Sequence, residues 1–419
     1  MTRACIMMMT VAGFASQAQA ETSRAQVVET YADIAAAAYQ DSLTTAQSLR
    51  DAVAKLTESP SDATLTAARA AWLAARDPYM QTEVFRFGNP IVDDWEGRVN
   101  AWPLDEGLID GVADGYYGAG ENEFAQLNVI ATPRFTLSGE EVDASVITPA
   151  LLSEVLQEAD GSEANVATGY HAIEFLLWGQ DLVSDAPMAG QRPWTDYAQG
   201  ADCTGGNCDR RAAYLTVAAD LLVDDLSFMA DQWGDDGAAR AAVTADPQAG
   251  IAAMLTGIGN LSYGEMAGQR VKLGLILHDP EEEHDCFSDN TPSSHYHDVL
   301  GMQNVWLGTY TRTDGAVVSG PALSDVVAEA DPALAAALTG ELAATVAAAD
   351  ALRVAQAGGM HYDMLLQVGN PQGEALINPL IDALVEQSRS IERVSRVLGV
   401  NGVVVEGDDT LEAAGEVFQ

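Results

Sequence analysis

Positive charge is scarce in this chain of 419 residues. It has 20 Lys and Arg residues against 62 Asp and Glu residues, which gives a formal net charge of −42 at pH 7. A surface of this charge repels nucleic-acid phosphates and anionic lipids, so we expect no nucleic acid among its partners. Disorder is excluded as well, because 48% of the residues are hydrophobic. The charge instead favours solubility and the attraction of cations.

Cysteine is nearly absent, with four residues in the chain. Cys203 and Cys208 flank a Gly-containing turn, and close cysteines of this kind pair in an oxidising compartment. We predict a disulfide between them, with Cys286 left unpaired. Zinc binding by Cys203 and Cys208 is the alternative. It is disfavoured because four residues separate them and no second Cys or His pair lies close in the sequence.

Long apolar runs are lacking after the N-terminus. Residues 1–20 begin with a short positive region at Arg3, continue with an apolar stretch at 6–14 and end in small residues, which is the pattern of a cleaved secretory signal. Cys5 precedes the apolar stretch and is therefore not placed as a lipid anchor. No later run reaches about 18 residues, so we predict no transmembrane helix. We expect a periplasmic or secreted monomer.

Patterns typical of strands are also few. Val403-Val404-Val405 and residues 316–318 are short and flanked by Gly, so we expect extended edges or small hairpins there. Helical spacing dominates elsewhere, as in Leu65, Ala68 and Trp72. Capping and breaking residues predict helices after Ser61, at 148–161, from Pro332 to Gln356 and at 379–398.

The helical content predicts an all-α fold of two helical-bundle domains. We place the N-terminal domain at 21–240 and the C-terminal domain at 241–405, followed by a tail at 406–419. Gly- and Asp-rich sequence near 235–248 marks the boundary between them. The stretches 89–120, 179–207 and 278–320 are predicted as long irregular loops, and loops of this length are usually functional.

The motif with the clearest chemistry is Gly169-Tyr170-His171-Ala172-Ile173-Glu174. His171 and Glu174 are three residues apart, so on a helix they project from one face about 5–6 Å apart. An imidazole and a carboxylate so placed can share a metal ion, as Glu-x-x-His pairs do in iron-binding bundles. The alternative is a His–Glu hydrogen bond within a helical core.

Four of the six histidines lie between residues 278 and 297, together with carboxylates. A cluster of imidazoles and carboxylates is suited to iron, zinc or copper. The alternative is a polar loop exposed to solvent. The candidates in this stretch are His278, His284, Asp285, Asp289, His295 and His297, and Cys286 is either a further ligand or a buried thiol.

Other charged residues are candidates for lining the same site. Glu83 and Asp105 are the carboxylates that we expect to add to the metal site of His171 and Glu174. Arg76, Glu83 and Arg86 are expected on one helix, which Pro78 would interrupt, and surface salt bridging is the alternative. Site-lining roles are also considered for Arg76, Arg86, Trp102, Glu265, Arg270, His284, Asp285 and Asp289, although Glu265 and Arg270 fit a buried structural pair equally well.

The motif around His171 and Glu174, followed by Phe-Leu-Leu-Trp-Gly, resembles the signature of the imelysin family, in particular its iron-regulated branch. The resemblance extends over nearly all of the chain after residue 20. Its other segments are Ala71 to Tyr79 with Glu83 and Arg86, Val99 to Asp105, Glu281 to Thr291, and Gly369 to the last helix. This sequence has Ser and Pro where His is more common beside Thr291, so the His-rich segment departs from that branch.

The resemblance implies an exported helical protein connected with iron uptake or homeostasis, with its site between two bundles. We therefore expect iron binding, with zinc or calcium as other candidate ions and envelope iron-uptake components as candidate partners. The alternative is a metallopeptidase, as the family's peptidase label implies. A zinc peptidase needs three protein ligands, an open position for water and a general base. The chain has no His-Glu-x-x-His motif, and sequence spacing identifies no third ligand.

Overall fold

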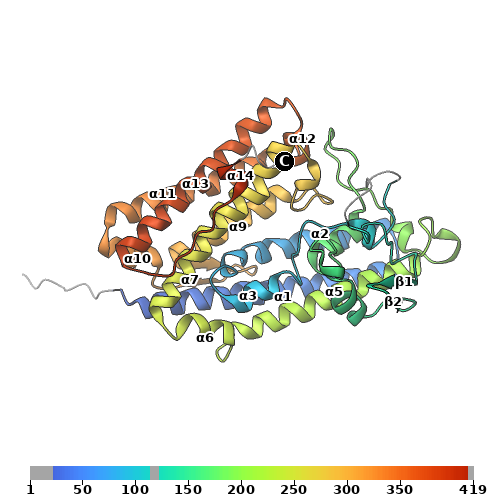
Figure 1. Ribbon diagram of the computed structural model, residues 1–419, viewed down its shortest axis with the longest axis horizontal. Helices are drawn as coiled ribbons and strands as arrows, with labels where there is room; N and C mark the ends of the chain where they lie inside the picture. The colour runs from blue at the N-terminus through green and yellow to red at the C-terminus, as the bar shows by residue number, and fades with distance from the viewer. Residues whose placement is uncertain (1–21, 114–121, 414–419) are drawn as a thin grey trace, which may run out of the picture.

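The helices of the protein gather in two groups that lie side by side (Figure 1). The computed structural model describes residues 22–113 and 122–413. The predicted signal at 1–20 lies outside these residues. The all-α fold class is confirmed, since the strands described are short and paired only in two hairpins. The division into two separately folding domains stays a prediction.

The first group is built on the long helix α1, which packs against α2 and α5. Ser61 begins α2 as predicted, because its side chain accepts a hydrogen bond from the backbone N–H of Thr64 in a capping box. The helices of this group are α1 (Arg24–Glu58), α2 (Asp62–Met80), α3 (Pro90–Glu96), α4 (Gly169–Trp178), α5 (Cys208–Gln232) and α6 (Ala238–Thr244).

Aromatic side chains fill the core of this first group. Tyr31, Tyr39 and Trp233 are fully buried, and the Tyr39 and Trp233 rings stack with centroids 6.3 Å apart. Phe85 packs against all three rings. Buried aromatic contacts of this type stabilise beyond the area they remove from water.

The second group packs α11 against α13 and α9. α11 begins at Pro332 as predicted, after Asp331, whose carboxylate accepts hydrogen bonds from the backbone N–H groups of Ala333 and Leu334. The helices of this group are α7 (Pro247–Asn260), α8 (Leu273–Leu277), α9 (Thr291–Leu307), α10 (Leu323–Ala330), α11 (Pro332–Ala357), α12 (Tyr362–Leu366), α13 (Pro371–Leu398) and α14 (Asp409–Glu412).

A π-helical stretch, η7 (Leu261–Lys272), joins α7 to α8 in one continuous helix. Such stretches are rare and frequently occur at functional sites. The i→i+5 pattern of a π-helix brings residues five apart close together, and Arg270 Nε donates to Glu265 Oε1 at 2.8 Å. The predicted pairing of Glu265 with Arg270 is therefore present.

The remaining elements are single turns and two hairpins. Strand β4 includes residues that we expected to be extended, whereas the β1–β2 hairpin is not predicted and Val403-Val404-Val405 forms no strand. The strands are β1 (Arg134–Leu137), β2 (Glu140–Asp143), β3 (Thr309–Thr311) and β4 (Val317–Ser319). The short helical turns are η1 (Glu83–Phe85), η2 (Glu106–Leu108), η3 (Leu151–Leu156), η4 (Ala159–Gly161), η5 (Trp194–Tyr197), η6 (Gly200–Asp202) and η8 (Pro280–Glu282).

Several predicted helix bounds are wrong. The expected helix at 148–161 is the short π-helix η3 followed by a turn, in which Asp160 has a left-handed backbone. The last helix begins at Pro371 rather than at 379, because Asn370 caps it and Pro379 is accommodated inside it. Pro78 likewise lies inside α2 without ending it.

The stretch 278–320 is not one irregular loop, because α9 occupies its centre. Pro292 stands in the first turn of α9, where a missing N–H costs nothing. His295 is completely buried and His297 is 14% exposed at its side chain, so these histidines do not belong to a solvated loop. α9 also packs on α2, where the two groups of helices meet.

One later segment, α11, meets the length and composition of a membrane span, although the sequence predicts no transmembrane helix. This helix has 26 residues, and a window within it has a mean hydropathy of 1.4. Its alanines raise the hydropathy, and one face of it packs against α9, α10 and α13. Length and composition alone are weak evidence for a membrane span, because core helices of soluble proteins share them.

The structure contains the predicted disulfide between Cys203 and Cys208 and leaves Cys286 unpaired. The bond closes the turn that precedes α5.

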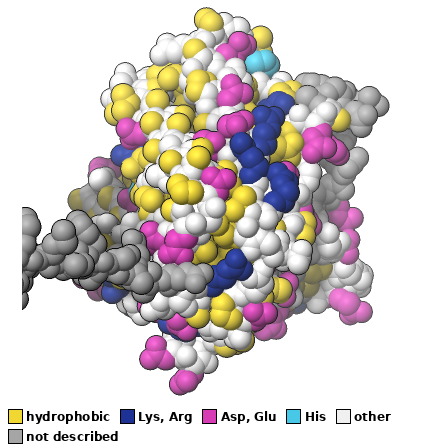
Figure 2. Space-filling view, turned by 90° about the vertical axis from the view of Figure 1, so that its left-hand side faces the viewer, with side chains coloured by type: hydrophobic (Ala, Val, Ile, Leu, Met, Phe, Trp, Pro, Cys, Tyr) yellow, Lys and Arg dark blue, Asp and Glu magenta, His cyan; other side chains and the backbone are white. Residues whose placement is uncertain are grey.

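On the surface, Figure 2 shows one end of the molecule, where acidic side chains are scattered and a short row of Lys and Arg side chains crosses between hydrophobic ones.

Candidate functional site

Helix α4 carries His171 and Glu174 into the interior. All ten of its residues are buried, as expected of a helix that is apolar on every side. Gly169 begins it with φ +81°, and a Cβ there would lie 2.4 Å from the Val99 carbonyl oxygen. Only glycine allows the backbone of residue 169 to lie this close to Val99. The close contact holds α4 against the segment that follows α3. Trp72 fixes the same turn by donating its indole N–H to the Tyr170 carbonyl at 2.9 Å.

His171 and Glu174 face each other, as their spacing predicts. His171 Nδ1 lies 3.2 Å from Glu174 Oε2, and the side chains are 1% and 0% exposed. Ser288 holds the other carboxylate oxygen, donating to Glu174 Oε1 from its backbone N–H at 2.9 Å and from its hydroxyl at 2.6 Å. Burial, with the Asp285 charge nearby, raises the pKa of Glu174 well above its usual range.

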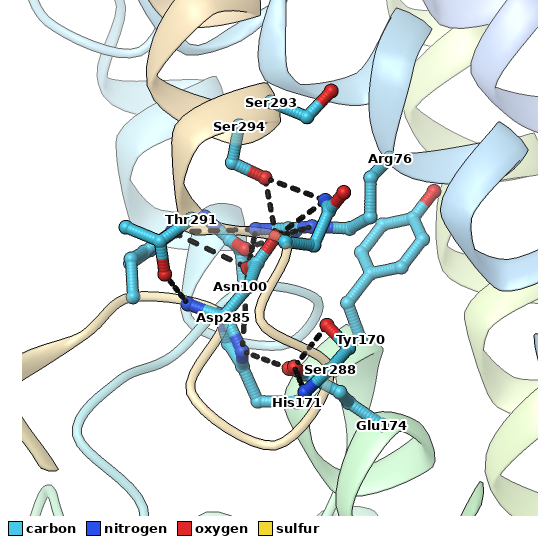
Figure 3. A network of polar contacts seen from close by, with 12 residues as sticks. Arg76, Asn100, Tyr170, His171, Glu174, Asp285, Ser288, Thr291, Ser293 and Ser294 are labelled. Atoms are coloured by element: carbon cyan, nitrogen blue, oxygen red, sulfur yellow. Dashed lines mark hydrogen bonds and ion pairs between the residues drawn. The ribbon is translucent and has the colours of Figure 1, made fainter. Parts of the chain in front are cut away.

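Arg76 lies at the centre of the polar network drawn in Figure 3. Its guanidinium is completely buried and donates to Asp285 Oδ1 at 2.7 Å and to Asn100 Oδ1 at 2.6 Å. Asp285 also accepts from Asn290 at 2.8 Å and from Ser294. Burial acts to raise the pKa of Asp285, but the Arg76 charge and the hydrogen bonds from Ser294 and Asn290 together lower it.

His284 joins this network from the segment before α9. Its Nδ1 lies 3.3 Å from Arg76 Nη2, and its ring meets the His171 ring edge to face, with centroids 4.8 Å apart. Burial, assisted by the Arg76 charge, lowers the pKa of His171 to about 3. Burial, with Arg270 nearby, lowers the pKa of His284 well below its usual range. Both imidazoles are therefore neutral at pH 7.

These contacts define a central cluster made of Arg76, Asn100, His171, Glu174, His284 and Asp285. Within it, His171, His284 and Asp285 each offer a ligand atom, and the three atoms lie within 4.8 Å of one another. His171 Nε2 is buried and has no hydrogen-bond partner among the described residues. The arrangement therefore places nitrogen and oxygen donors of metal-binding type together.

A second ionic network lies beside the central cluster, around Arg270. Arg270 contacts Glu83 at 2.7 Å, Glu265 at 2.6 Å and Asp298 at 3.3 Å. Arg86 joins it at 3.6 Å from Glu265. Three carboxyl groups near two guanidinium groups explain how these polar side chains remain largely buried.

A cleft of about 420 Å³ leads from solvent to these two networks. Trp102 lines it and presents its ring to His284, with centroids 5.7 Å apart. Arg86, Glu265, Arg270 and His284 also line it. The cleft gives a small solute a way to His284, whereas Glu174 and Asp285 are completely buried.

The structure brings together only part of the predicted site. Arg76 and Glu83 do not share a helix, because α2 ends at Met80, and Glu83 pairs with Arg270. Asp105 directly precedes η2, contacts Asn122 and lines a different cavity. Asp289 binds His361 instead of joining Asp285. Glu83, Asp105 and Asp289 thus stand outside the trio of His171, His284 and Asp285.

Sequence reasoning did not identify several residues of the two networks. These residues are of common types, and their spacing in the sequence is not diagnostic of a site. They are Asn100, Ser288, Ser294 and Asp298. Asp298 directly follows His295-Tyr296-His297 and is completely buried. The available signal is the three-residue spacing of His295 and Asp298, which places them on one helix face, but assigning that stretch to a loop hides it.

Comparisons with known proteins agree with this architecture. Iron-regulated protein A of Synechococcus elongatus is 36% identical over 104 residues, which are 25% of this chain and 25% of that protein. This chain therefore matches about a quarter of the length of that curated relative. The crystal structure of a putative iron-regulated protein A precursor from Parabacteroides distasonis has a TM-score of 0.64 at 19% identity, covering 91% of this chain and 97% of that one.

An imelysin-like protein from Psychrobacter arcticus gives a TM-score of 0.57 at 17% identity, covering 91% of this chain and 98% of that one. At these identities, the two crystal structures show a common fold. The family model described as imelysin, which also bears a peptidase label, matches residues 35–391. That span is most of the chain and contains the His171–Glu174 motif, Arg76, and the segment of His284 and Asp285, so the protein belongs to the imelysin family.

Proposed function

We propose that this protein binds a metal ion, iron in the first place, in the central cluster and serves iron uptake or homeostasis in the cell envelope. The observation that carries the proposal is the convergence of His171, His284 and Asp285, with His171 Nε2 buried and unpartnered. The iron-regulated names of the relatives support the choice of iron.

The donor chemistry of the cluster fits a transition metal. Neutral imidazole is the form that binds metal, and the lowered pKa values of His171 and His284 keep both rings neutral. Imidazole with carboxylate suits iron and zinc, whereas calcium prefers oxygen ligands alone. His171, His284 and Asp285 would hold the ion, and Glu174 supplies a second carboxylate beside His171.

Arg76 limits the charge that the cluster can accept. It already neutralises Asp285, and its own charge repels a cation placed beside it. Binding an ion therefore favours loss of the proton that the raised pKa of Glu174 retains. We expect metal binding to release protons into the buffer.

The peptidase alternative has some support in the same residues. Three candidate ligands and the adjacent Glu174 match the number of groups that a zinc peptidase needs. Their burial argues against it, because His171 and Glu174 are at most 1% exposed and a polypeptide substrate needs an open groove. We therefore favour metal binding over peptide hydrolysis as the function of the central cluster.

The test is metal analysis and calorimetric titration of untagged protein with ferrous iron, zinc and calcium. His171→Ala should abolish the bound iron, and Glu174→Gln should weaken binding without loss of helix. His297→Ala is the matched control, because His297 contacts Asp77 outside the central cluster. Unchanged iron stoichiometry in both site variants would show that the His171–Glu174 pair is structural.

Two further assays separate the remaining parts of the proposal. Casein and peptide mixtures incubated with the metal-loaded protein test catalysis, and cleavage that is lost in Glu174→Gln would favour the peptidase. Export is tested by N-terminal sequencing of protein from the periplasm or medium. A chain that starts near residue 21 there supports the signal at 1–20, whereas retention of the intact chain in the cytoplasm contradicts it.

A further inference from the structure

A second group of acidic side chains lies outside the central cluster. Asp181 follows α4, Glu283 and Asp289 flank the segment before α9, and Asp363 lies in α12. Asp181, Asp289 and Asp363 each offer an oxygen, and these oxygens lie within 4.8 Å of one another. Glu283, Asp181 and Asp363 line one small common cavity. We call these four residues the carboxylate clasp, because they come from segments far apart in the chain.

The clasp contains oxygens that the protein leaves without partners. Among the described residues, Glu283 Oε2, Asp289 Oδ1 and Asp363 Oδ2 are buried and accept no hydrogen bond. Glu283 is 1% exposed, and Asp289 and Asp363 are each 2% exposed. A buried carboxylate oxygen without a partner is costly, so three of them within one group of four acidic residues call for a cation.

Positive charge within the protein does not satisfy this group. In the described part of the chain, the one ion pair made by the four residues joins Asp289 to His361, whose Nδ1 lies 2.6 Å from Asp289 Oδ2. Asp285 of the central cluster, by contrast, is paired with Arg76. Burial, with Asp289 as a neighbouring charge, raises the pKa of Asp363 to about 7, which shows the mutual repulsion of the group.

We propose that the carboxylate clasp is a binding site for a hard divalent cation of the calcium type. Its donors are oxygens, in contrast to the imidazoles of the central cluster. Calcium takes oxygens at about 2.3–2.6 Å, so two opposite ligands stand about 4.6–5.2 Å apart, which the clasp can span. Magnesium requires shorter distances of about 2.0–2.1 Å and a stricter octahedron.

A cation in the clasp ties together segments that carry the central cluster. Glu283 directly precedes His284 and Asp285, and Asp289 directly follows Ser288, which holds Glu174. Asp181 continues from α4, and Asp363 belongs to the second group of helices. Occupation of the clasp therefore fixes both ends of the segment 283–289, and with it the positions of His284 and Asp285.

The experiment measures calcium binding to the full mature chain after treatment with EDTA. Calorimetry with calcium chloride should show one site that is stronger than the diffuse binding expected of an acidic surface, and Tm should rise with calcium concentration. Magnesium at equal concentration should raise Tm less. Absence of a saturable site, or an equal response to both ions, overturns the proposal.

One variant should change the stability of the protein in opposite directions without and with calcium. Asp363→Asn keeps the shape but removes one of the repelling charges, so without calcium it should be at least as stable as the wild type. With calcium it should be less stable, since a ligand is weakened. Asp382→Asn, an exposed change on α13, is the matched control and should respond to calcium like the wild type. If Asp363→Asn binds calcium as the wild type does, the clasp is not the site.

Protons shared between the carboxylates are the alternative to a bound cation. Measurements of Tm with and without calcium distinguish the two. If the carboxylates share protons instead, lowering the pH should raise Tm with no effect of calcium, and this result overturns the proposal. His171→Ala serves to separate the two sites. It should leave calcium binding intact even when iron binding is lost, so failure of one proposal is distinguishable from failure of the other.

Discussion

Arg76 and Asp285 form a completely buried ion pair, with Nη2 and Oδ1 2.7 Å apart, although 209 positions separate them in the chain. The pair connects α2 of the first group of helices to the segment before α9 of the second. His171 and His284 both lie beside it, with their Nδ1 atoms 3.9 Å and 3.6 Å from Asp285 Oδ1. The Arg76 guanidinium thus helps to fix the position of the two groups of helices relative to each other.

Removing one member of this pair should destabilise the protein strongly. Asp285→Asn leaves the Arg76 charge buried without its counter-ion, and such losses cost about 3–5 kcal/mol. Urea unfolding followed by circular dichroism measures the change. Glu386→Gln, which breaks an exposed pair with Arg389, should cost less than about 1 kcal/mol. Equal effects of the two variants would contradict the central role of Arg76.

Ser288→Ala should weaken metal binding without removing a ligand. The Ser288 hydroxyl orients Glu174, and loss of such orienting hydrogen bonds lowers metal affinity by about 10–100-fold. Isothermal titration with ferrous iron under anaerobic conditions gives the affinity. Ser293→Ala is the control, because Ser293 contacts Asp77 and not Glu174. An unchanged affinity in Ser288→Ala would count against Glu174 as part of the site.

His295 should make stability depend on pH. Burial, with Arg270 nearby, lowers its pKa to about 3, so between pH 6.5 and 3 the unfolded chain binds a proton that the folded chain does not. This contribution to stability is present above pH 6.5 and is lost as the pH falls.

The comparison of wild type with His295→Leu isolates that contribution. Between pH 7 and pH 5, the stability of the wild type relative to His295→Leu should fall by about 2 kcal/mol, at 1.36 kcal/mol per pH unit below about 6.5. Urea unfolding at the two pH values supplies the numbers. A difference that does not change with pH would mean that His295 is protonated alike in both states.

Gly169→Ala should disturb the start of α4 severely. The new methyl group would meet the Val99 carbonyl oxygen at 2.4 Å, and φ of +81° adds strain, for a total cost of about 2–5 kcal/mol. Gly139→Ala has a similar φ of +86° with no atom within 4 Å, so it should cost only about 1 kcal/mol. Thermal unfolding compares the two, and a similar loss in both would show that the approach to Val99 is unimportant.

The Cys203–Cys208 disulfide should contribute about 2 kcal/mol, because it closes a short loop with a sequence separation of 5. Cys203→Ser together with Cys208→Ser tests this by urea unfolding, with Cys286→Ser as the control that leaves the bond intact. Intact mass before and after alkylation should show one disulfide and one free thiol. Pairing of Cys286 with either partner would refute the assignment.

The sequence predicts local features of this protein better than distant ones. The His171–Glu174 face follows from three-residue spacing, and the caps at Ser61 and Asp331 follow from side-chain chemistry at a helix end. The trio with His284 and Asp285 depends on packing between segments more than 100 positions apart, which spacing does not encode.

The errors have identifiable physical causes. The sequence predicts an interruption at Pro78 and a helix start at Pro379, but both prolines lie inside helices, where caps and packing elsewhere outweigh the missing hydrogen bond. The polar residues of the stretch 278–320 suggest a solvated loop, but Arg76 and Arg270 supply buried partners for Asp285 and Asp298. Buried ion pairs make a hydrophilic sequence compatible with a core.

The π-helical stretch η7 makes the helix from Pro247 to Leu277 sensitive to its own length. An α-helix advances by about 100° per residue, so deleting one residue between Asn260 and Glu265 would turn everything beyond it by roughly that angle. Arg270 would then point away from Glu83 and Asp298, which it now contacts. The number of residues in this helix, and not only their kind, is a condition for the ionic network beside the central cluster.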